Sequence, residues 1–126
     1  MGTNNKRILI VDDSQTMRQL IKMALHRLSS TTIEEAVDGA AGLKMLATEH
    51  YDVVLLDVNM PVMDGLTLLK TLRSTPNLAK TPVIMLTKEG MDDVKQKAGS
   101  FGVSAYLTKP AKSAEILAAV QKALAE

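Results

Sequence analysis

The chain has 126 residues, of which 46% are hydrophobic and 23% are charged, values typical of one soluble globular domain. With 15 basic and 14 acidic residues the net charge is +1, so there is no global electrostatic reason to expect a nucleic acid or a membrane surface as partner. Cysteine is absent, which excludes disulfides and thiolate chemistry, and no apolar stretch reaches the ~20 residues of a membrane helix. The first residues lead into a strand rather than a signal peptide, and we expect a cytoplasmic protein.

The first predicted strand, residues 8–11, stops at two acids, Asp12 and Asp13. Apolar residues then recur at three- and four-residue steps, which predicts a helix capped by Ser14. The predicted inward face of this helix consists of Met17, Leu20, Ile21, Ala24, Leu25 and Leu28.

A weaker strand follows at residues 32–36, and its polarity predicts an edge position in a sheet. The next helix follows Asp38, with an expected inward face of Leu43, Leu46 and Ala47.

The third strand, residues 53–56, ends at Asp57 and is followed by a Pro- and Gly-containing turn at residues 60–65. Asp64 is a candidate cap for the third helix, which places Leu66, Leu69 and Leu72 on one side. The fourth strand, residues 83–86, stops at Thr87, and the fifth, residues 105–107, runs toward Lys109. The last two helices have predicted inward faces of Met91, Val94, Ala98 and Phe101, and, from near Ser113, of Ile116, Leu117, Val120 and Leu124.

Five strands alternating with five helices predict parallel βαβ units in a doubly wound α/β fold. In such folds ligands bind at the carboxyl ends of the strands, where the strand order reverses. The polar residues that end four of the strands are therefore expected to meet at one edge: Asp12, Asp13, Asp57, Thr87 and Lys109.

Three converging carboxylates repel one another unless a cation or protons neutralise them. Mg²⁺ suits such a cluster, because it prefers oxygen ligands and keeps waters or phosphate oxygens in its shell. Asp12, Asp13 and Asp57 are the candidate carboxylate ligands, and Asn59 is a candidate donor of a backbone oxygen.

Lys109 and Thr87 add the charge and the hydroxyl that a phosphoryl group needs. Asp57 is the best candidate nucleophile, because it is an isolated acid that could keep the group as an acyl phosphate. Taken singly, each motif has a structural interpretation as a helix cap, a turn, a strand end or a loop, and only their coincidence at the strand ends favours function. Tyr106 is open to both interpretations, as half-buried packing or as part of the site.

Nearly the whole chain resembles the receiver domain of two-component response regulators, particularly the stand-alone regulators of chemotaxis. The resemblance rests on residues 10–18, residues 57–65, Thr87 and the pair Lys109 and Pro110. It implies a flavodoxin-like sheet of five parallel strands in the order 2-1-3-4-5 with five flanking helices, and a cis peptide bond before Pro110. Residues 1–126 are expected to form a single receiver domain without an output domain.

The resemblance also implies roles for the residues. Asp57 accepts a phosphoryl group from a histidine kinase, with Mg²⁺ held by Asp12, Asp13, Asp57 and the Asn59 carbonyl. Thr87 and Lys109 contact the phosphoryl group.

In the family the threonine then shifts and an aromatic residue on the fifth strand, here Tyr106, turns inward. This movement remodels the face made by the fourth helix, fifth strand and fifth helix, which is a two-state switch biased by a covalent charge.

Asn59 and Glu89 are the pair seen in regulators that lose their phosphate quickly, and with Lys88 they are the predicted residues that tune dephosphorylation. Three positions depart from the family pattern. Lys88 replaces a small residue, Val58 replaces a tryptophan, and Ala111 replaces a phenylalanine.

The resemblance predicts signalling by binding rather than enzymatic turnover, with only self-catalysed phosphorylation and dephosphorylation. The expected partners are a histidine kinase, the flagellar motor switch and a possible phosphatase, and the expected state is a monomer. The main alternative is a phosphorelay intermediate that passes phosphate to a histidine phosphotransfer protein. An aspartyl-nucleophile phosphatase is a third interpretation, although such an enzyme usually needs a second acid where Asn59 stands. A flavin-binding protein is disfavoured by the acids that follow the first strand.

Overall fold

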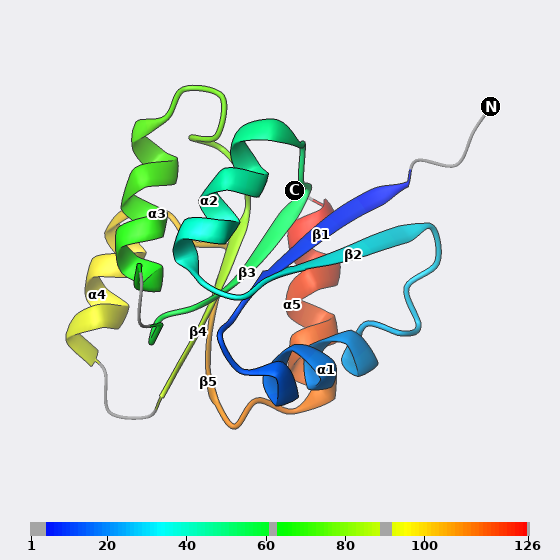
Figure 1. Ribbon diagram of the computed structural model, residues 1–126. Helices are drawn as coiled ribbons and strands as arrows, with labels where there is room; N and C mark the ends of the chain where they lie inside the picture. The colour runs from blue at the N-terminus through cyan, green and yellow to red at the C-terminus, as the bar shows by residue number, and fades with distance from the viewer. Residues whose placement is uncertain (1–4, 61–62, 89–91, 126) are drawn as a thin grey trace.

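The structure, a computed structural model, describes residues 5–60, 63–88 and 92–125. Strands and helices alternate along the described chain (Figure 1). In order they are β1 (Lys6–Val11), α1 (Gln15–Ala24), β2 (Thr31–Ala36), α2 (Gly39–Thr48), β3 (Val53–Asp57), α3 (Gly65–Ser74), β4 (Val83–Lys88), α4 (Asp92–Ser100), β5 (Ala105–Lys109) and α5 (Ser113–Ala125).

The strands form one parallel sheet in the order β2-β1-β3-β4-β5. The chain moves outward from β1 to β2, returns to β3 on the other side of β1, and continues to β5. The strand order therefore reverses between β1 and β3, which creates the crevice where doubly wound folds bind ligands. Both the predicted fold class and the predicted strand order are confirmed.

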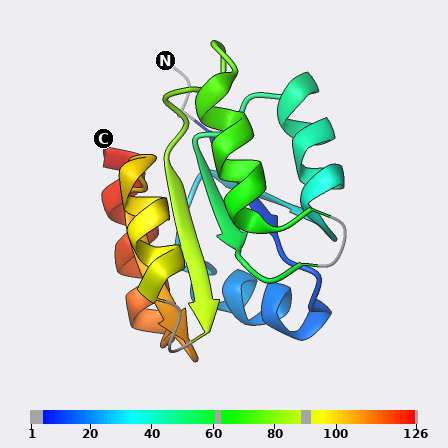
Figure 2. The same ribbon diagram turned by 90° about the vertical axis from the view of Figure 1, so that its left-hand side faces the viewer.

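Helices cover both faces of the sheet. In Figures 1 and 2, α1 and α5 lie on one face and α2, α3 and α4 lie on the other, and the arrowheads of β3 and β4 point toward the same end of the molecule. Each face has its own apolar core, and residues alternate between the two cores along a strand, as Val54 and Leu55 of β3 do. Because β1, β3 and β4 are covered on both sides, their sequences are almost entirely apolar.

The polar strand β2 lies at the edge of the sheet, as its sequence predicts. Its two glutamates form ion pairs with different elements of the fold. Glu34 pairs with Arg7 of β1 at 3.0 Å and accepts a hydrogen bond from the hydroxyl of Tyr51, whereas Glu35 pairs with Arg18 of α1 at 2.9 Å. Charged side chains are therefore compatible with this strand, because each finds a partner at a half-exposed edge.

The helix starts follow their predicted caps. The Ser14 hydroxyl accepts a hydrogen bond from the Met17 amide, and the Asp64 carboxylate accepts one from Thr67 at the start of α3. Asp38 caps α2 in the same way. These bonds satisfy amides that have no partner within the helix. No helix among the described ranges has the length and apolar character to cross a membrane.

Two predicted core positions are wrong. Leu20 of α1 is 50% exposed, and Ala47 of α2 is exposed. Both lie at the margin of their apolar stripe, and α2 instead buries Gly42 and Leu46. A three- and four-residue spacing defines a stripe wider than the sheet covers, so its edge positions remain in solvent. Met91, predicted for the fourth helix, lies outside the described residues.

The contact between Tyr51 and Glu34 makes stability depend on alkaline pH. Burial, the hydrogen bond to Glu34 and its charge raise the pKa of Tyr51 from its usual 10.0 to about 12. Between these values the unfolded chain loses the tyrosine proton while the folded chain keeps it. The free energy of unfolding is therefore expected to fall by about 2 kcal/mol from pH 10 to pH 12 through this one group.

Urea unfolding of wild type and Tyr51→Phe across this pH range tests the expectation. The variant, which has no ionisable group at residue 51, should lose this part of the pH dependence. Tyr106→Phe is the matched control and should retain it. Parallel pH profiles for wild type and Tyr51→Phe would contradict the assignment.

Candidate functional site

The polar residues predicted for the site lie together at the carboxyl ends of four strands. Asp12 directly follows β1 and Asp57 ends β3. Thr87 is the penultimate residue of β4, and Lys109 ends β5. Asp12, Asp57 and Thr87 are 1%, 2% and 2% exposed, which makes them the buried polar side chains of the described chain. Burial of two acids in a core of aliphatic side chains is costly and indicates a functional constraint.

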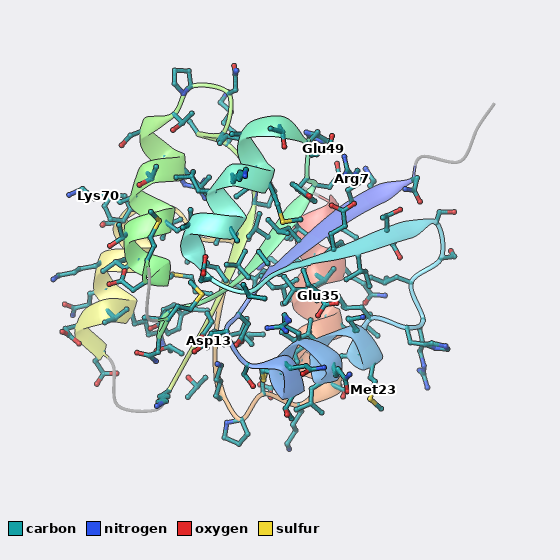
Figure 3. All side chains as sticks on the ribbon, in the orientation of Figure 1. Arg7, Asp13, Met23, Glu35, Glu49 and Lys70 are labelled. Carbon is teal, nitrogen blue, oxygen red and sulfur yellow. The ribbon has the colours of Figure 1, made fainter. Side chains whose placement is uncertain are left out.

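The three aspartates form one carboxylate cluster. Asp12, Asp13 and Asp57 each contribute an oxygen, and these oxygens lie within 4.8 Å of one another. Asp13 is exposed, whereas the other two are buried. Figure 3 places Asp13 at the end of the sheet opposite Arg7 and Glu49, so the cluster opens to solvent at the carboxyl ends of the strands.

Lys109 supplies the positive charge at this cluster. Its Nζ donates to Asp57 Oδ1 at 2.9 Å and lies 3.4 Å from Asp12 Oδ2, so that one ammonium links β5 to β1 and β3. Partial burial of these groups strengthens the attraction relative to a surface ion pair. One lysine nevertheless leaves the group of three acids with an excess of negative charge.

Asp57 shows the consequence of this crowding. Burial raises the pKa of its carboxyl above the ordinary value, and the negative charge of Asp12 acts in the same direction. Lys109 and the amide of Asn59 oppose them by hydrogen bonding to the carboxylate. An additional cation would therefore favour the ionised form that a nucleophile needs.

The donor set suits a hard divalent cation. Carboxylate oxygens from Asp12, Asp13 and Asp57 converge from two adjacent strands, and the exposed side of Asp13 leaves room for water or substrate oxygens. Mg²⁺ prefers this combination of a few carboxylates with exchangeable ligands. These three residues therefore fit the metal that the sequence indicates.

Two hydrogen bonds hold Asp12 in place. The Ser14 amide donates to Asp12 Oδ1 at 2.8 Å, and Arg18 Nη1 donates to the Asp12 carbonyl oxygen at 2.6 Å. Arg18 is itself paired with Glu35 of the edge strand. Sequence reasoning missed this support from Arg18, because Arg18 and Glu35 read separately as a solvated helix residue and a polar strand residue.

Gly65 allows α3 to begin directly against the backbone of Asp57. A β-carbon added at Gly65 would lie 2.3 Å from the Asp57 carbonyl oxygen and 2.9 Å from the Cα of Val58. The Gly65 amide also donates to the Val58 carbonyl at 2.9 Å. The glycine therefore determines how closely the helix approaches the strand end that carries Asp57.

Tyr106 lies in β5, and its side chain packs against the core on the face of the sheet that α2, α3 and α4 cover. It is paired in register with Met85, two residues before Thr87, so that Tyr106 and Thr87 project toward the same face. Its hydroxyl is buried and has no hydrogen-bond partner among the described residues, and Lys95 Nζ lies 5.7 Å from its ring centroid. An unpaired buried hydroxyl is costly, which fits a side chain with more than one position.

The other predicted residues are placed as follows. Asn59 and Lys88 are exposed, Val58 is 4% exposed, and Ala111 packs against the core beneath α1 and α5. The peptide bond between Lys109 and Pro110 is cis, as predicted. Glu89 lies outside the described residues.

Comparison with known protein families gives a match over most of the chain. Residues 8–121 match the response regulator receiver domain family. The chain belongs to this family. The match spans β1 through most of α5 and includes every residue of the carboxylate cluster.

Curated receiver domains of similar length support the match. The chain is 40% identical to chemotaxis protein CheY-3 of Vibrio cholerae serotype O1 over 112 residues, which cover 89% of this chain and 86% of that protein. It is 42% identical to chemotaxis protein CheY of Pseudomonas aeruginosa over 104 residues, which cover 82% of this chain and 84% of that one.

Solved structures show the same fold. The receiver domain superimposes on chemotaxis protein CheY4 of Vibrio cholerae with a TM-score of 0.85 and 34% identity, covering 94% of this chain and 98% of that one. The receiver domain of Francisella response regulator 1452 gives a TM-score of 0.85 and 33% identity, with coverage of 96% and 98%. Flavodoxin and CheY are the established examples of this strand order, so the order follows a precedent.

The contact between Gly65 and Asp57 leads to a matched pair of substitutions. Gly65→Ala is expected to lower the free energy of unfolding by about 1 to 3 kcal/mol, because the new methyl group overlaps the backbone of β3. Gly99→Ala in α4 meets no atom within 4 Å and should raise stability by about 0.5 to 1 kcal/mol, the usual gain for alanine in a helix.

Urea denaturation of both variants measures these changes. Unchanged stability of Gly65→Ala would show that α3 can shift away from Asp57 without cost, and would contradict the close packing described above.

Proposed function

We propose that Asp57 is the phosphoacceptor of this receiver domain and takes its phosphoryl group from a histidine kinase. The observation that supports this most strongly is the position of Asp57, a buried carboxylate that shares a cluster with two acids and accepts a hydrogen bond from Lys109. An Asp57 oxygen attacks phosphorus as the bond from phosphorus to the donor nitrogen breaks, and the nitrogen keeps the electron pair. The product is an acyl phosphate.

In this proposal Asp12, Asp13 and Asp57 hold Mg²⁺ together with the backbone carbonyl of Asn59. The metal supplies charge neutralisation for the transferring phosphoryl group. Lys109 keeps the carboxylate oriented and balances part of its charge, while Thr87 offers a hydroxyl to the phosphoryl oxygens. The buried surroundings of Asp57 strengthen these electrostatic contributions.

Phosphorylation would then change the face formed by α4, β5 and α5. Thr87 and Tyr106 project toward the same side of the sheet, so movement of the threonine opens or closes space for the tyrosine. The buried hydroxyl of Tyr106 has no hydrogen-bond partner among the described residues, which supports a side chain that can take a second position. Such a pair of states can be biased by one covalent charge.

Chemotaxis is the favoured setting, because relatives 40% and 42% identical are named as chemotaxis proteins. The proposed partners are a sensor histidine kinase and a phosphorylation-dependent target such as the flagellar motor switch, with a possible phosphatase, all in the cytoplasm. Residues 1–126 act as one receiver domain, and its monomeric state stays a prediction. Asn59, Glu89 and the departure at Lys88 tune the phosphate lifetime.

Two other functions remain alternatives. A phosphorelay intermediate would use the same site and pass the group to a histidine phosphotransfer protein. An aspartyl-nucleophile phosphatase would need a general acid, and the amide of Asn59 stands where that acid is usual. A signalling protein that turns over only its own phosphate is therefore the better description than an enzyme.

Phosphorylation can be measured directly as intact mass after incubation with Mg²⁺ and acetyl phosphate. Wild type should gain one phosphoryl group, with no gain when EDTA replaces the metal, and should then lose it spontaneously. Asp57→Asn should show no adduct, because an amide cannot attack phosphorus effectively.

An adduct that persists in Asp57→Asn would place the acceptor elsewhere. Absence of an adduct in wild type would leave a binding module that acts without phosphorylation. Catalytic hydrolysis of added phosphate monoesters would favour the phosphatase instead.

Metal binding should be visible without any phosphodonor. At a Mg²⁺ concentration about ten times the Kd, the free energy of unfolding of wild type should rise by about 1.4 kcal/mol. Asp13→Asn removes one exposed member of the cluster and should largely abolish this rise while retaining the fold.

Thermal unfolding at increasing Mg²⁺ concentration tests this, with Asp93→Asn as the matched control. Asp93 is an exposed acid in the first turn of α4 and is not a member of the carboxylate cluster, so this variant should respond like wild type. An equal response of Asp13→Asn and wild type would remove Asp13 from the proposed ligand set.

A further inference from the structure

Lys88 is the exposed last residue of β4, and β4 lies next to β3, the strand that ends at Asp57. In register, Asp57 of β3 pairs with Leu86 of β4, and Lys88 follows two residues later. Residues two apart on a strand project to the same face, so Lys88 projects to the side of the sheet that Asp57 faces. The strand spacing and rise place the two Cα atoms ~8 Å apart.

Lys88 is also the register partner of Lys109 on β5. The two lysines therefore stand side by side at the end of the sheet, but their surroundings differ. Lys109 Nζ is committed to Asp57 and Asp12, whereas Lys88 is exposed and forms no ion pair with any described residue. Two adjacent ammonium groups repel each other unless anions lie nearby.

A phosphodonor meets a crowded set of charges. Asp12, Asp13 and Asp57 carry three negative charges when ionised. Lys109 offsets one of them and a bound Mg²⁺ would offset the other two, so that Lys88 adds a positive charge that these acids do not neutralise. A dianionic phosphoryl group must approach these charges to reach Asp57, which is itself 2% exposed. A free cation at the open end of the strands lowers this barrier most for the donor that carries the most negative charge.

We propose that Lys88 is a specificity-determining residue that favours dianionic phosphodonors at the Asp57 site. The proposal rests on the proposed function of Asp57 and extends it to the choice of donor. Lys88 acts on the approaching phosphoryl oxygens, while Lys109 stays with the carboxylates. The long, flexible stem of lysine lets its ammonium follow the donor without a fixed partner.

Two small donors separate charge from size. With acetyl phosphate, an Asp57 oxygen bonds to phosphorus as acetate leaves with the electron pair of the broken phosphorus–oxygen bond. With phosphoramidate, whose nitrogen is protonated at neutral pH, ammonia leaves with the electron pair of the phosphorus–nitrogen bond. Acetyl phosphate arrives as a dianion and phosphoramidate with a net charge of minus one, although both transfer the same group to the same oxygen.

The experiment compares initial rates of adduct formation, measured by intact mass, for wild type, Lys88→Gln, Lys88→Arg and Lys88→Glu at saturating Mg²⁺ and low ionic strength. If the Cα separation of ~8 Å is taken as the distance between the ammonium and a dianionic donor, a unit charge in water changes the rate ~5-fold. Lys88→Gln should therefore be ~5-fold slower with acetyl phosphate and only ~2-fold slower with phosphoramidate. Lys88→Glu should deepen both losses, and Lys88→Arg should restore both rates.

Salt and a distant lysine provide the controls. The difference between wild type and Lys88→Gln should nearly vanish at ~1 M salt, where the screening length is ~3 Å. Lys70 lies on α3 and points away from the end of the sheet that carries Asp13 (Figure 3), so Lys70→Gln should phosphorylate like wild type with both donors.

The proposal would be overturned if Lys88→Gln lowered the rates with both donors equally. It would also be overturned if high salt did not remove the difference in rate, or if Lys88→Arg were as slow as Lys88→Gln. Either result would favour a steric effect of the side chain. Wild-type rates in Lys88→Gln and Lys88→Glu would also overturn it. Failure of wild type itself to form an adduct with either donor would instead overturn the proposed function of Asp57, and this result is distinct from every loss confined to Lys88 variants.

Discussion

Repulsion among three carboxylates at the end of a buried sheet is the constraint on which the functional part of the molecule depends. Asp12 and Asp57 are almost completely buried, and their oxygens share a small space with an oxygen of Asp13. Burial raises the pKa of Asp57, and Lys109 only partly compensates. A site of this kind is costly to the fold and is best relieved by a ligand that carries positive charge.

The doubly wound sheet makes this arrangement possible. Because the strand order reverses between β1 and β3, the loops after these strands lead to helices on opposite faces and leave a crevice between them. The acids occupy that crevice on short, rigid strand ends. Arg18 holds the backbone of Asp12, and Gly65 lets α3 pack against the backbone of Asp57. The surrounding apolar cores therefore fix the positions of charges that would otherwise move apart.

The same sheet connects the acids with a surface. Thr87 and Tyr106 lie on adjacent strands and face α4, while Asp57 faces the side of α1 and α5. Backbone hydrogen bonds keep the residues of these neighbouring strands in register. In the proposed function, a change of charge at Asp57 reaches Tyr106 through β4, and the buried hydroxyl of Tyr106 has no hydrogen-bond partner among the described residues.

The sequence by itself determined the fold class and the strand ends, and it predicted which polar residues meet there. Apolar runs that stop at Asp12, Asp57 and Thr87 are local signals, because the period of a strand and the cap of a helix are set by neighbouring residues. Tertiary structure decided the rest: the ion pair from Arg18 to Glu35, the exposure of Leu20, and the alignment of Lys88 with Lys109. These features depend on which strands and helices become neighbours, and residues far apart in the chain carry no local sign of that contact.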